Sequence, residues 1–115
     1  MSQAETVVIV SEEELYNKIE RAVLAVPGVS HLTADGFQDI ISGLGQAFGF
    51  KGRKGLLLRR SKKLGVKVDI SLALYSGCRV NETARYIQMV IRSILVSSIE
   101  DNIYGIDVTV TDIVK

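Results

Sequence analysis

The first part of the chain changes from the hydrophobic pattern of a strand to that of a helix. Residues 6–10 (TVVIV) are a β-branched run and predict a short strand. Ser11, with Glu14 three positions later, has the capping-box pattern of a helix start. Apolar residues then recur at three- and four-residue steps until Pro27, which disfavours helical geometry in the residue before it. The expected buried face of this helix consists of Leu15, Ile19, Ala22, Val23 and Val26.

The middle of the chain is rich in glycine and gives weaker signals. Residues 29–33 predict a short strand. Apolar residues between Phe37 and Phe48 fall at helical spacing, but each glycine costs a helix about 1 kcal/mol relative to alanine. We therefore expect a weak helix there, followed by a glycine-rich basic loop over residues 43–55.

Two strands are predicted after this loop, over residues 56–60 and 66–75, with a polar turn between them. The second strand alternates cleanly, which is typical of an antiparallel or mixed sheet with one buried and one wetter face. The side chains expected on the buried face are Val66, Val68, Ile70, Leu72 and Leu74, and those expected on the wetter face are Lys67, Asp69, Ser71, Ala73 and Tyr75.

The last part of the chain predicts a long helix and a final strand. Asn81 is the expected N-cap of a helix of about 20 residues. Residues 104–114 alternate as a strand, and a strand, a crossover helix and another strand predict a parallel pair. The predicted fold class is α+β: a mixed β-sheet packed by two main helices, in the order β-α-β-(α)-β-β-α-β. The expected core stripe of the long helix is Ala84, Ile87, Ile91, Ile94, Leu95 and Ser98.

Length and composition limit the class of protein. The 115 residues suit a single domain over residues 1–115, with residues 1–5 expected to be disordered. A single cysteine, Cys78, excludes an internal disulfide and favours a reducing, intracellular compartment. The acidic N-terminus lacks the basic start of a signal peptide, and no apolar run approaches the roughly 18 residues of a membrane span.

Charge is unevenly distributed although the net charge is only +1. Residues 51–67 carry eight basic residues and no acid, which can attract phosphates or anionic lipid. The string Gly52-Arg53-Lys54-Gly55 matches the GxxG loop with which KH domains clamp nucleic acid, although no second helix is predicted after it and a solvated loop is the simpler interpretation. The candidate anion or nucleic-acid contacts are Lys51, Arg53, Lys54, Arg59, Arg60, Lys62 and Lys63.

Residues suited to catalysis do not form a recognisable group. His31 is the only histidine, and Cys78, beside Arg79 and before a helix, has no other candidate base. Asp35 and Asp39 are spaced as an i, i+4 pair, which is more often solvated surface than an acid–base dyad. No metal-binding motif is present. We therefore predict no enzymatic activity, no cofactor and no metal.

The long helix carries apolar residues on the side opposite its core stripe. Met89, Val96 and Ile103 are spaced by seven, with Arg85 and Arg92 beside them. Isolated surface apolar residues are common, but a line of them is typical of an association surface. These five residues are the candidate interaction surface.

Several strings, taken in order, resemble the alkaline shock protein family of bacterial stress proteins. They include VIVSEEEL (residues 8–15), VPGV (26–29), NETARYIQ (81–88) and IDVTVTDI (106–113), with the strand of residues 65–75 between them. The resemblance implies a non-enzymatic, cytoplasmic protein associated with the cell envelope and alkaline stress. It also implies self-association as a homo-oligomer and a location at the inner membrane surface through a separate membrane-anchored partner.

Two functions remain as alternatives. The first is a stress-response scaffold or adaptor that acts through protein–protein contacts. The second is a nucleic-acid- or anionic-lipid-binding module that uses residues 51–67, and it is distinguished by strongly salt-dependent binding.

Overall fold

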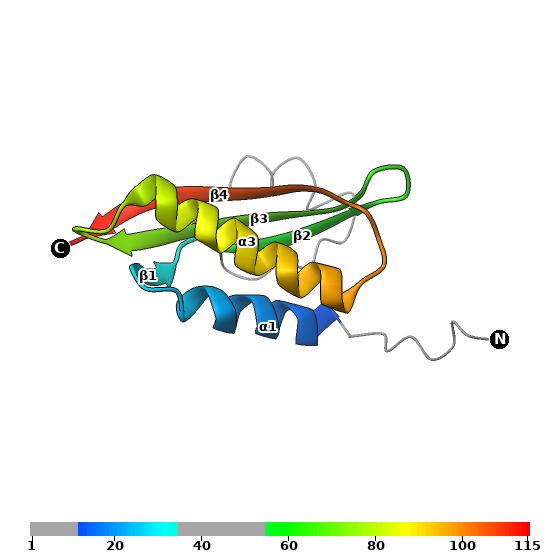
Figure 1. Ribbon diagram of the computed structural model, residues 1–115, viewed down its shortest axis with the longest axis horizontal. Coiled ribbons are helices and arrows are strands. Elements are labelled where there is room, and N and C mark those ends of the chain that lie inside the picture. The colour runs from blue at the N-terminus through cyan, green and yellow to red at the C-terminus, as the bar shows by residue number, and fades with distance from the viewer. Residues whose placement is uncertain (1–11, 35–54) are drawn as a thin grey trace.

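The structure, a computed structural model, describes residues 12–34 and 55–115. The predicted strand at 6–10, the Ser11 cap, the weak helix and most of the glycine-rich loop lie outside these residues. The elements in chain order are α1 (Glu12–Leu24), β1 (Val29–Leu32), β2 (Leu56–Ser61), β3 (Gly65–Tyr75), α3 (Val80–Ser98) and β4 (Ile103–Val114). The predicted α+β class, with a mixed sheet and two main helices, is confirmed (Figure 1).

The sheet is built around β3, which has neighbours on both sides. β4 runs parallel to β3 along one side, as the crossover through α3 predicts. β1 and β2 are both antiparallel to β3 and share its other side. They meet at Ser71, whose N–H donates to Gly55 O at 2.9 Å and whose C=O accepts from the Thr33 N–H at 2.9 Å. The two short strands therefore follow each other end to end along β3.

The junction of β1 and β2 requires glycine at position 55. Gly55 has φ +77°, a conformation that other residues rarely adopt. A Cβ there would lie 2.7 Å from the Cβ of Leu32 and 2.9 Å from Ser71 O. The tight approach of the three backbones leaves no room for a side chain.

Both helices contribute to one core with one face of the sheet, and α3 crosses that face diagonally in Figure 1. The even-numbered side chains of β3 point into this core, as their alternation predicts. The fully buried residues at its centre include Leu15, Val23, Leu56, Val66, Val68, Ile70, Leu72, Leu74, Ile87, Ile91 and Leu95.

The prediction of a wetter face on β3 is wrong for three of its five residues. Asp69 is 4% exposed, and Ser71 and Ala73 are fully buried. β3 is the central strand, and side chains from the strands on both sides of it contribute to covering this face. The Thr33 hydroxyl, for example, lies 2.7 Å from the Ser71 hydroxyl and 2.6 Å from that of Thr111.

The start of α3 also differs from the prediction. Arg79, and not Asn81, is the N-cap residue, and it makes no side-chain cap bond. Its carbonyl accepts the Thr83 N–H at 2.8 Å, which is the first bond of the helix. The turn before the helix contains Gly77, whose φ of +96° is a conformation that other residues rarely adopt.

Candidate interaction surfaces

The outer face of α3 presents large apolar side chains to solvent. Met89 is 66% exposed and Val96 is 65% exposed, so their predicted outward orientation is confirmed. Tyr86, which the sequence analysis did not include, is 51% exposed and lies three residues before Met89, on the same side of the helix. The signal that could have found it is this i, i+3 spacing. Tyr86, Met89 and Val96 together are called the α3 outer face below.

Ile103 does not belong to this surface. The helix ends at Ser98, and Ile103 is the first residue of β4, partly buried against the core. Its spacing of seven from Val96 has no helical meaning, because four residues separate the two elements.

Two arginines lie beside the α3 outer face, as predicted. Arg85 and Arg92 are exposed, and each lies within one helical turn of Met89. Neither forms an ion pair within the part of the chain that the structure describes. Their charges are therefore available to a partner.

An apolar groove of about 450 Å³ lies between α1 and α3. Helical periodicity places its α3 side, at Ile94 and Ser97, next to the α3 outer face. Its α1 side carries two basic residues, Lys18 and Arg21, for which the described residues supply no ion pair. The lining residues are Lys18, Arg21, Ala22, Ala25, Ile94 and Ser97.

The described part of the basic segment is largely neutralised by acids from elsewhere. Arg59 contacts Asp69 at 2.9 Å, and Lys67 contacts Asp107 at 2.9 Å. Arg60 contacts two acids, one at the start of α1 and one in the α3–β4 connection, at 3.2 and 3.7 Å. In the rest of this segment, Lys51, Arg53 and Lys54 lie outside the described residues.

Two lysines of this segment remain without an ion pair among the residues described. Lys62 and Lys63 lie in the turn between β2 and β3 and are exposed. Leu64 follows them and is 54% exposed. Within residues 55–67, the basic side chains without an ion pair among the described residues are therefore those at the tip of this hairpin.

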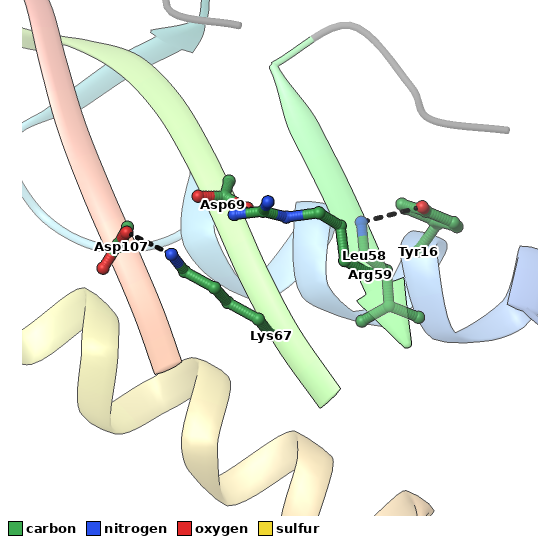
Figure 2. A network of polar contacts seen from close by, with 6 residues as sticks. All are labelled: Tyr16, Leu58, Arg59, Lys67, Asp69 and Asp107. Carbon is green, nitrogen blue, oxygen red and sulfur yellow. Dashed lines mark hydrogen bonds and ion pairs between the residues drawn. The ribbon is translucent and has the colours of Figure 1, made fainter. Parts of the chain in front are cut away.

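Four charged side chains lie in a row across the sheet, and their charges alternate from negative to positive in the order Asp107, Lys67, Asp69 and Arg59 (Figure 2). Register places Arg59 opposite Lys67, and Asp69 opposite Asp107, so like charges face each other directly. The two ion pairs join residues that are not register partners, and they offset this repulsion. The Lys67 stem passes over Gly105, where a Cβ would lie 3.2 Å from it. These ion pairs connect β2, β3 and β4, and the four charges are therefore already paired within the chain.

The candidates for catalysis are not brought together. His31 is exposed on β1, and its Nδ1 lies 2.9 Å from the Ser30 hydroxyl. Cys78 is a free, half-buried cysteine before α3. Asp35 and Asp39 lie outside the described residues. Over residues 12–34 and 55–115, no group of three or more His, Cys, Asp or Glu could hold a metal ion.

No helix within the described ranges is long and apolar enough to cross a membrane. No family model matches the chain, and no curated protein and no solved structure matches it either.

Proposed function

We propose that this protein is a non-enzymatic scaffold or adaptor that binds other proteins through the α3 outer face. The observation that carries the proposal is the exposure of Met89 and Val96, each about two-thirds open to solvent on the same side of one helix. Full burial of such a side chain contributes about 1.5–3 kcal/mol, so a partner that covers both gains substantial binding energy.

The basic residues around this face, which form no ion pair among the described residues, indicate the chemistry of the partner. Arg85 and Arg92 lie beside it, and Lys18 and Arg21 border the neighbouring groove. A partner segment with apolar side chains flanked by acids matches this layout, because opposite charges at the rim speed association and fix orientation. An amphipathic acidic helix meets both requirements.

The resemblance to the alkaline shock protein family supports the biological setting. It implies a stress-response role at the cell envelope, with the chain in the cytoplasm and peripheral to the inner membrane. A small membrane-anchored partner whose cytoplasmic segment binds α3 would provide that location. The resemblance also implies self-association, which we propose as well, without assigning it to the α3 outer face.

The test compares apolar-to-acid changes on and off the α3 outer face. Met89→Glu with Val96→Glu should weaken partner capture about 100-fold or more, since two central apolar contacts are lost and charge is buried. Leu64→Glu, at a residue 54% exposed on the hairpin tip, is the matched control and should bind normally. Binding of the proteins co-purified with wild type would be measured by titration; equal affinity for both variants would contradict the proposal.

The second candidate is binding to an anionic surface, either nucleic acid or lipid, through the β2–β3 hairpin tip. It is favoured by the exposure of Lys62, Lys63 and Leu64. Each lysine near an anionic membrane contributes about 1 kcal/mol. Flotation with anionic vesicles and a gel shift with RNA at low salt separate the two ligands. Lys62→Gln with Lys63→Gln should abolish whichever binding occurs, and the candidate fails if wild type binds neither.

A further inference from the structure

The outer edge of β4 is an open strand edge in the described part of the chain, because β4 pairs only with β3. Unpaired N–H and C=O groups on such an edge are a template for another strand. The other side of the sheet is partly protected, since the Leu58 N–H donates to the Tyr16 hydroxyl at 3.0 Å (Figure 2).

The register shows which groups of β4 point outward. The N–H and C=O of Ser71 both point to the side of β3 where β1 and β2 lie, so those of Ile70 and Leu72 point toward β4. Ile70 is the register partner of Val108, and in a parallel pair it bonds to the residues on either side of that partner. The backbone N–H and C=O groups of Val108 therefore point away from β3. Those of Ile106 and Val110, two residues before and after it, point the same way.

The open part of this edge is short and has definite ends. At one end the Gln88 side chain, from α3, donates to Ile106 O at 2.9 Å. At the other end the register shifts between Val110 and Asp112, and the Asp112 carboxylate accepts the Ile113 N–H at 2.9 Å. Between these ends, no hydrogen bond among the described residues engages the outward groups of Val108 and Val110.

We infer that β4 pairs with β4 of a second copy of this chain, antiparallel and centred on Val108. The inference goes beyond the proposed partner on α3 and does not depend on it. In this register Ile106 faces Val110 of the second copy, and Val108 faces its own equivalent. These pairs of β-branched side chains lie on the helix face, where Val108 and Val110 are only partly buried in the single chain. A second copy would complete their burial.

The opposite face selects the same register. There Asp107 faces Thr109 of the second copy, so no like charges are directly opposed. Moving the centre to Asp107 would oppose two carboxylates, and moving it to Thr109 would place Ile106 against Asp112. A register shifted by an odd number of residues is excluded, because helix-face side chains of one copy would then be paired with side chains of the opposite face in the second copy. Of the three centres Asp107, Val108 and Thr109, Val108 is therefore the one that avoids both unfavourable oppositions.

The test changes the charge at Thr109, which is exposed on β4 and faces Asp107 of the second copy in the inferred dimer. Thr109→Lys should tighten the dimer and Thr109→Asp should weaken it. Symmetry places two such pairs in each dimer, so the dissociation constant should change by roughly two- to thirty-fold in each direction. Sedimentation equilibrium measures the constants, and far-UV circular dichroism checks that each variant is folded.

The control applies the same charges at Ser93, which is exposed on α3. Ser93→Lys and Ser93→Asp should leave the dimer unchanged. A wild-type chain that stays monomeric at millimolar concentration would overturn the inference. So would a dimer that responds to Ser93 and not to Thr109, because self-association would then use α3. Neither result bears on the capture of a different protein by the α3 outer face.

Discussion

The ion pair between Arg59 and Asp69 should dominate the polar contribution to the stability of the sheet. The Asp69 side chain is 6% exposed and that of Arg59 is 27% exposed, and Nε and a terminal nitrogen of the guanidinium lie 3.0 and 2.9 Å from Asp69 Oδ2. Removal of Arg59 would leave a nearly buried carboxylate directly opposite Asp107. Breaking a buried pair in this way costs about 3–5 kcal/mol. Since Arg59 is partly solvated, we expect Arg59→Met to lower the free energy of unfolding by about 3 kcal/mol, at the lower end of that range.

The reverse change should be milder, and the double change milder still. In Asp69→Leu the arginine keeps access to solvent through its exposed part, so we expect a loss of about 1 kcal/mol. In Arg59→Met with Asp69→Leu no charge remains unpaired, and apolar replacement of a buried pair is often neutral. The double variant should therefore lie within about 1 kcal/mol of wild type. This non-additivity is the signature of a direct interaction.

Urea unfolding followed by circular dichroism measures these differences, provided that the m-values agree. Arg60→Met is the matched control, because the contacts of Arg60 join side chains that are 42–50% exposed. Exposed pairs contribute at most about 1 kcal/mol. If Arg59→Met and Arg60→Met have the same stability, the reasoning from burial is refuted.

Two further changes test close contacts in the fold. Gly65→Ala should cost more than about 3 kcal/mol, because a Cβ would lie 2.0 Å from Asn102 O at φ +107°. Gly77→Ala, with φ +96° and open space around it, should cost only about 1 kcal/mol of backbone strain; equal urea midpoints would contradict this account. Tyr16→Phe should cost about 1–3 kcal/mol and speed hydrogen exchange at the Leu58 amide, whose bond to the hydroxyl is lost. Unchanged exchange at that amide would show that the bond does not protect it.

Hydrophobic periodicity was sufficient to locate the elements that lie in the described residues. The three- and four-residue steps in α1 and α3, and the alternation in β3, are signals that local geometry imposes directly. The parallel pairing of β3 and β4 also followed, because a helix between two strands leaves few other connections.

Burial on the second face of β3 could not be predicted from alternation alone. Asp69, Ser71 and Ala73 have the composition of a solvated face. Whether such a face is covered depends on which parts of the chain pack against it, and alternation along one strand does not contain that information. Asp69 is accommodated only because Arg59, ten residues earlier, comes to lie beside it.

The side chains at the sheet edges were missed for a related reason. Tyr16 and Gln88 lie on helices, where a polar side chain is usually solvated, and each bonds a backbone group of an outer strand. Their bonds span 42 and 18 residues, so no local pattern contains them. The placement of Ile103 failed differently, because a seven-residue spacing has meaning only within one helix.

The two proposed surfaces are geometrically compatible. Antiparallel pairing of β4 with its copy continues one sheet, and the two-fold axis then lies perpendicular to that sheet. Such an axis keeps the helices of both copies on the same face, so the two α3 outer faces point the same way. A partner fixed in a membrane, with several copies side by side, would then engage both faces at once. Once one α3 outer face is bound, the other binds its partner at a high effective concentration. The dimer is therefore held at the membrane more strongly than a monomer, although each α3 outer face makes the same contacts. For that reason Thr109→Asp should weaken binding to a surface crowded with the partner more than it weakens binding to the free partner, and surface plasmon resonance at high and low partner density measures the difference.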